Sequence, residues 1–129
     1  MPRIPFNSSL VGVNVVTAYL PNHSRPDDSQ YTFAYTVTIS NGSNLPVQLL
    51  SRHWIITDAD NEVQEVRGEG VVGEQPVLEP HGSFTYTSGC PLRTSFGTME
   101  GTYQMTTGAG EQFDVRIAPF TLSEPYTVH

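Results

Sequence analysis

Residues Tyr31–Ser40, YTFAYTVTIS, show the clearest pattern in the sequence. Large and small side chains alternate along this stretch, so the large residues share one face and the small ones the other. Successive side chains of a β-strand point to opposite faces, and this period of two therefore predicts a strand with one face in the core. We expect it to be central to the fold. The large residues are Tyr31, Phe33, Tyr35, Val37 and Ile39.

Other segments extend this pattern on both sides. Residues 47–57 are apolar on both faces, with Leu49 expected on one face and Trp54 on the other, which predicts an interior strand. The turn sequence DADN that follows, residues 58–61, predicts a hairpin with residues 62–67. Four further segments are expected strands: residues 11–15, 83–88, 98–107 and 112–117.

The strand count predicts the fold class. No window of eleven or more residues has apolar positions at helical spacing without an interrupting Gly or Pro, so helix is excluded. Seven to nine short strands, with turn signals about every ten residues, predict a single all-β domain: an antiparallel β-sandwich of fibronectin type III or immunoglobulin character. A small closed barrel is the alternative. The domain is expected to span residues 1–129, with a loose N-terminal arm over 1–9 and a loose tail over 123–129.

Composition narrows the classes of partner. The chain has 129 residues and a net charge of −7, and all six of its basic residues are Arg. Such a surface repels phosphate backbones, so we expect no nucleic-acid partner. No apolar run approaches the roughly 18 residues of a membrane span, and no signal-peptide core is present, which predicts a cytoplasmic protein without membrane insertion. The single cysteine, Cys90, is expected to be a packed thiol.

Gly68, Gly70 and Gly73 match the pattern GxGxxG. In dinucleotide-binding proteins a helix follows these glycines and its N-terminus receives the phosphates. Here Pro76 follows closely and no helix can begin, so we interpret the glycines as sites of bending between sheets. The alternative is a phosphate nest of backbone N–H groups, beside Arg67, that holds a nucleoside or dinucleoside polyphosphate with a divalent metal.

Asp58, Asp60 and Glu62 have the spacing of calcium ligands in an EF-hand loop. Val63 stands where that loop requires Gly, and flanking helices are absent. We therefore expect a solvated hairpin, with weak Mg²⁺ binding by these carboxylates as the alternative. No cofactor is expected.

No pattern points to catalysis. Cys90, or a serine, with His53 or His81 would be the candidates for a nucleophile and its base, but the four histidines are scattered and no nucleophile signature surrounds Cys90. We expect no enzyme. Arg52, His53 and Trp54 form a candidate interaction surface, because Trp and Arg are enriched at binding hot spots. A core position for Trp54 is the other interpretation.

The chain resembles the ApaG family, also called CorD. The strings that carry the resemblance include LLSRHWIITD, EVQEVRGEGVVGEQP and FTYTSGCPL, and it extends over about residues 11–122. The family's glycine motif falls on Gly68, Gly70 and Gly73 without departure.

This resemblance implies a fibronectin type III-like module of the bacterial cytosol with no established enzymatic activity and no defined catalytic residues. It also implies an association with cobalt resistance and magnesium efflux, and a gene beside one for a diadenosine tetraphosphate hydrolase. Similar eukaryotic domains are attached to an F-box protein, which implies protein binding. We therefore expect an unidentified protein partner, and a monomer or weak homodimer, since the edge strands of a sandwich invite pairing.

Overall fold

A computed structural model describes residues 5–125, and residues 1–4 and 126–129 lie outside the described part. The described part holds eight strands, three short 3₁₀ turns and no α-helix. The strands are β1 (Val11–Tyr19), β2 (Tyr31–Asn41), β3 (Val47–Asp58), β4 (Val63–Glu69), β5 (Val77–Leu78), β6 (Ser83–Leu92), β7 (Phe96–Thr107) and β8 (Gln112–Ser123). The 3₁₀ turns are η1 (Ser8–Leu10), η2 (Pro21–His23) and η3 (Pro26–Asp28).

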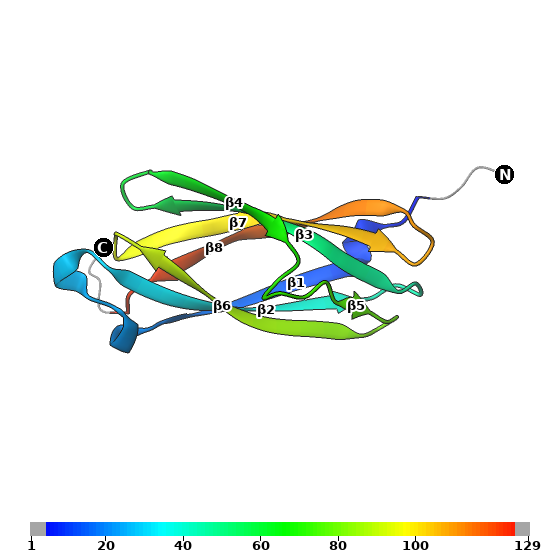
Figure 1. Cartoon of the computed structure of the whole chain (residues 1–129), viewed down its shortest axis with the longest axis horizontal. Coiled ribbons are helices and arrows are strands. Elements are labelled where there is room, and N and C mark those ends of the chain that lie inside the picture. The colour runs from blue at the N-terminus through cyan, green and yellow to red at the C-terminus, as the bar shows by residue number, and fades with distance from the viewer. Residues whose placement is uncertain (1–4, 126–129) are drawn as a thin grey trace.

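The strands form two antiparallel sheets that face each other, as Figure 1 shows. One sheet has the order β1-β2-β6, and the other has the order β4-β3-β7-β8, with β5 also paired to β3. The predicted β-sandwich is confirmed. Strands β1 and β8 contact each other along one side of the sandwich. We call the opposite side, where the edge strands β4 and β6 lie, the open side.

Strand β2 occupies the centre of its sheet, between β1 and β6. The large residues Phe33, Tyr35, Val37 and Ile39 are buried, as the alternation predicted. On the outer face, hydroxyl groups of facing threonines bond between β2 and β6: Thr36 with Thr87 at 2.8 Å, and Thr38 with Thr85 at 3.0 Å. The small residues thus form a polar outer surface on this sheet.

Strand β3 differs from the predicted arrangement of its faces. Leu49 and Trp54 were expected on opposite faces, yet both are buried in the core. The register of β3 against β7 shifts between Leu49 and Ser51, so Leu50 is the extra residue of a β-bulge. Because of this extra residue, odd-numbered residues face the core before the bulge and even-numbered residues face it after the bulge. Leu49, Arg52 and Trp54 therefore all face inward.

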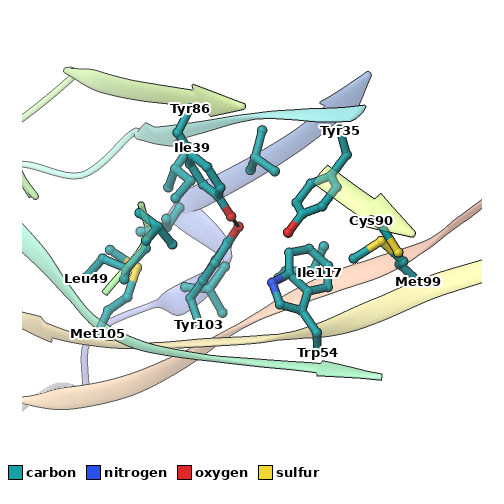
Figure 2. Close-up of a cluster of buried hydrophobic side chains, with 14 of the residues drawn as sticks. Tyr35, Ile39, Leu49, Trp54, Tyr86, Cys90, Met99, Tyr103, Met105 and Ile117 are labelled. Carbon is teal, nitrogen blue, oxygen red and sulfur yellow. Dashed lines mark hydrogen bonds between the residues drawn. The ribbon is translucent and has the colours of Figure 1, made fainter. Parts of the chain in front are cut away.

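The core is built around Trp54 and three tyrosines (Figure 2). The indole is 2% exposed and meets the rings of Tyr35 and Tyr103 edge-on, with ring centroids 5.4 Å and 6.2 Å apart. The hydroxyl of Tyr86, on β6, is hydrogen-bonded to that of Tyr103, on β7. This bond joins the two sheets through the middle of the core.

Both ends of the described chain are attached to the sandwich. The ring of Phe6 packs on Phe113 with centroids 4.6 Å apart, and its N–H donates to the carboxylate of Glu111 at 2.5 Å. The arm expected to be loose over residues 1–9 is therefore anchored at Phe6. In the segment expected as a tail, the N–H of Glu124 donates to the carbonyl of Ser95 at 2.9 Å. Residues 1–4 of the expected arm and 126–129 of the expected tail lie outside the described residues.

Gly101 lies on β7 opposite Trp54, where β3 approaches closely. A Cβ atom on Gly101 would lie 2.1 Å from the carbonyl oxygen of His53, and that backbone cannot move without breaking the β3–β7 ladder. We predict that Gly101→Ala lowers the free energy of unfolding by about 3 kcal/mol, the range of severe overpacking. Gly12→Ala is the matched control, because a Cβ there meets nothing within 4 Å. Urea unfolding of both variants measures the effect, and equal stabilities would contradict it.

Candidate functional site

The glycine pattern forms a tight turn between β4 and β5. The backbone N–H groups of Val71 and Glu74 each donate to the carbonyl of the other, at 2.8 Å and 2.9 Å. The two central residues, Val72 and Gly73, have φ angles of +44° and +82°, as a type I′ turn requires. Val71 is buried, and its side chain anchors the turn to the core.

Each glycine of the pattern has a structural reason. A Cβ on Gly70 would lie 2.2 Å from the carbonyl oxygen of Glu74, and one on Gly68 would lie 2.8 Å from the guanidinium of Arg52. Gly73 needs its positive φ. The glycines therefore form the turn and make room for Arg52.

Arg52 is a charged side chain on the inner face of β3, half-buried and held by the turn. Its Nη1 donates to the carbonyl oxygens of Glu69 at 2.9 Å and Gly70 at 2.8 Å. Among residues 5–125 the single ion pair joins His53 to Glu65, so Arg52 has no carboxylate partner there. Its positive charge is thus fixed in place without being neutralised.

A cavity of about 240 Å³ lies on the open side, between Arg52 and the facing sheet. The glycine turn contributes Val71, Val72 and Gly73 to its wall. The two sheets contribute the polar residues Tyr35, Arg52, Tyr86 and Ser88, and Glu69 at the end of β4. A cation and three hydroxyl groups therefore converge on one small space.

The phenols at this cavity are neutral at physiological pH. Burial raises the pKa of Tyr86 to about 12 and also raises the pKa values of Tyr35 and Tyr103, while the charge of Arg52 acts in the opposite direction. Protonated phenols are hydrogen-bond donors. The cavity is accordingly rich in donors.

A larger groove of about 800 Å³ lies on the same side, beside the β3–β4 hairpin. Its apolar residues are Tyr31, Ile56, Val63 and Leu92. Its charged residues are Asp28, Asp58, Glu62 and Arg93. Both hollows therefore open between the edge strands β4 and β6.

The structure does not bring Arg52, His53 and Trp54 onto one surface. Arg52 and Trp54 face inward, as successive inner positions of β3, whereas His53 lies on the outer face and bonds Glu65 through Nε2 at 3.1 Å. Arg67 pairs with His53 in the register and is exposed on that same outer face. It therefore lies away from Arg52 and from the cavity.

The acidic residues Asp58, Asp60 and Glu62 form the turn of the β3–β4 hairpin. Asp58 Oδ1 accepts the backbone N–H groups of Asp60 at 2.8 Å and of Glu62 at 3.0 Å. Within the described residues, no three His, Cys, Asp or Glu side chains are grouped so that they could hold a metal ion. The carboxylate of Asp58 stabilises the turn.

The structure does not support a nucleophile and base among the candidate residues. Cys90 is buried, and burial raises the pKa of its thiol to about 11, so it is protonated at neutral pH. The ring of His81 lies 3.3 Å from the Asn44 side-chain oxygen. His129 lies outside the described residues. The structure pairs neither His53 nor His81 with Cys90.

The two facing sheets define an antiparallel β-sandwich of fibronectin type III or immunoglobulin character. Within this class the chain belongs to the ApaG domain family, whose model matches residues 21–107. The resemblance noted in the sequence is thereby confirmed. No helix in the described residues is long and apolar enough to cross a membrane.

Relatives named Protein ApaG match nearly the whole chain. The protein of Dechloromonas aromatica is 51% identical over 123 residues, which cover 95% of this chain and 97% of the relative. That of Bordetella pertussis is 55% identical over 117 residues, covering 91% and 89%. The crystal structure of a Bordetella pertussis protein described as ApaA has a TM-score of 0.88 at 54% identity, covering 91% of this chain and 95% of that one.

Sequence reasoning missed most of the cavity. Tyr35, Tyr86 and Ser88 were assigned only to strand faces, because they lie on β2 and β6, far in sequence from Arg52. One signal was present: an arginine two residues before a core tryptophan on a strand has to face inward as well.

Val72 is a β-branched residue in a left-handed conformation, which costs on the order of 1–3 kcal/mol. Asn adopts this conformation readily, and Asn-Gly is the preferred type I′ sequence. We predict that Val72→Asn raises the free energy of unfolding by about 1 kcal/mol. Val77→Asn is the control, since both valines are more than half exposed but Val77 lies in a strand. If thermal or urea unfolding shows Val72→Asn to be no more stable than wild type, the strain is not present.

Proposed function

We propose that this ApaG domain is a non-catalytic cytoplasmic module that supports Co²⁺ and Mg²⁺ homeostasis by binding another protein at the open side of the sandwich. The observation that carries the proposal is the groove beside the β3–β4 hairpin. Its volume, about 800 Å³, lies within the range of binding clefts. Its lining combines apolar and charged residues, as protein-binding surfaces do.

The neighbouring strands support a protein partner. Strands β4 and β6 are edges of their sheets, so each offers unpaired backbone groups to an extended segment. The exposed side chain of Val63 lies at the start of β4, where it is available for apolar contact. A partner that pairs with one edge would place its side chains in the groove.

The proposal is non-catalytic because the described residues offer no activated nucleophile. The thiol of Cys90 has a raised pKa and is buried, and the histidines near the hairpin and the loops bond other groups. The role in ion homeostasis comes from the family resemblance. An effect on ion transport would then pass through the bound partner.

The alternative, a polyphosphate held at the glycine turn, has one observation in its favour. Within the described residues, the backbone N–H groups of Val72 and Gly73 have no hydrogen-bond partner. However, Arg67 lies on the outer face, and a cavity of about 240 Å³ is smaller than nucleotide sites usually are. We therefore favour the protein partner.

The proposal is tested with two valines that are equally exposed, at 62% each: Val63 at the groove, and Val16 on β1. In a strain that lacks the chain, we expect reduced cobalt tolerance and altered Mg²⁺ efflux. Wild type and Val16→Arg should restore both, while Val63→Arg should leave them at the level of the deletion strain, because a charge at the groove blocks apolar docking.

Two outcomes would count against this account. Unchanged ion tolerance in the deletion strain would remove the role in homeostasis. Full restoration by Val63→Arg, with circular dichroism confirming that both variants fold, would remove the groove as the binding surface.

A further inference from the structure

The cavity behind the glycine turn contains an arginine whose charge is not neutralised. The Arg52 guanidinium is half-buried, and two backbone carbonyls hold its Nη1 in place. Nη2 and Nε make no hydrogen bond to the described residues. A half-buried cation without a partner has lost part of its hydration, which costs free energy. Because this guanidinium is already oriented, binding an anion there would regain that free energy through charge-assisted hydrogen bonds.

The opposite wall of the cavity adds further donors. The hydroxyl groups of Tyr35, Tyr86 and Ser88 come from β2 and β6, so the ligand space lies between the two sheets. Trp54 on β3 packs on the cavity residue Tyr35, with ring centroids 5.4 Å apart, and its buried indole N–H has no hydrogen-bond partner in the described residues. Figure 2 shows the indole nitrogen and the tyrosine hydroxyls gathered in the same region of the core.

Size and charge limit what can bind there. A volume of about 240 Å³ corresponds to roughly eight water molecules, enough for one small group but less than a nucleotide requires. Glu69 is among the lining residues and the chain carries a net charge of −7, so a monoanion is favoured over a dianion. The planar fork of a guanidinium matches a carboxylate with two parallel hydrogen bonds.

We propose that the cavity formed by Arg52, Tyr35, Tyr86, Ser88 and the glycine turn binds a carboxylate group. The free N–H groups of the guanidinium donate to the carboxylate oxygens. The hydroxyls of the facing sheet donate to the lone pairs of those oxygens that the guanidinium leaves open. The carboxylate belongs either to a free small acid or to an acidic side chain of a peptide. This site does not depend on the protein-binding proposal, because its donors are in place without any partner in the groove.

The test is an NMR titration that uses the single tryptophan as a reporter. Trp54 is the only Trp in the chain, so its indole N–H gives one resolved signal, from a ring that packs on the cavity residue Tyr35. The amides of Val72 and Gly73 report from the cavity wall. The probes are acetate, an acetylated and amidated Gly-Glu-Gly peptide, its Gly-Gln-Gly counterpart and inorganic phosphate, each to about 50 mM, since one charge-assisted contact gives millimolar affinity.

We expect saturable shifts of these three signals with acetate and with the glutamate peptide, and none with the glutamine peptide. Tighter binding of acetate assigns the site to free acids, and tighter binding of the glutamate peptide assigns it to a partner's side chain. Absence of saturable shifts with both carboxylates, or tighter binding of phosphate than of either, would overturn the proposal.

Matched variants locate the binding. Arg52→Gln should weaken carboxylate binding at least tenfold, whereas Arg67→Gln, which removes the same charge from the outer face, should change it less than twofold. Because Arg52→Gln also loses the bonds to the turn, Ser88→Ala provides a second variant that keeps them, with an expected weakening of two- to fivefold. Equal weakening by Arg67→Gln, or full affinity in both cavity variants, would overturn the assignment.

Discussion

The hydrogen bond between the hydroxyls of Tyr86 and Tyr103 is the polar contact that sets the relative position of the two sheets. These phenols come from different sheets, and both are buried, so a slide of one sheet over the other would leave each hydroxyl buried without its partner. Trp54 packs beside them, with its ring edge-on to Tyr103 and Tyr35. A polar bond surrounded by aromatic rings thus fixes one relative position of the sheets.

The candidate site follows from this arrangement and from the bulge at Leu50. The bulge lets Leu49 face the core at one end of β3 while Arg52 and Trp54 face it further along. An arginine on an inner face needs space and acceptors. Gly68 provides the space, and the carbonyls of Glu69 and Gly70 provide the acceptors, so the glycine turn and Arg52 form one unit. Tyr86, one of the two phenols that join the sheets, also lines the cavity.

The sequence predicted most of the fold because its strands obey a strict alternation. Seven of the eight strands were expected, including the β3–β4 hairpin, since their periodicity and turn residues are local signals. The short strand β5 was missed, because two residues carry no period. The faces of β3 were misassigned, because a bulge is defined by the register against β7, which the sequence of β3 alone does not contain.

The site was harder to predict than the fold. Gly68, Gly70 and Gly73 were expected to bend the chain between sheets, whereas they form a turn within one sheet, since β4 and β5 both pair with β3. They were also expected beside Arg67, the neighbour in sequence, and the structure pairs them with Arg52, the neighbour across the hairpin. Likewise, Arg52, His53 and Trp54 are consecutive and therefore alternate between faces. The residues of this site lie together because of the register between strands. The pattern of a single sequence predicts that register only where two strands form a hairpin.

The central claim is that the Tyr86–Tyr103 bond fixes the relative position of the two sheets, and a double-mutant cycle of unfolding free energies tests the coupling of the two hydroxyls most directly. Tyr86→Phe and Tyr103→Phe should each cost about 1–3 kcal/mol, because the remaining hydroxyl stays buried without a partner. The double variant should cost little more than one single variant, since no hydroxyl is then left unpaired. Costs that add to within about 0.5 kcal/mol would show that the two hydroxyls are not coupled and would contradict this account.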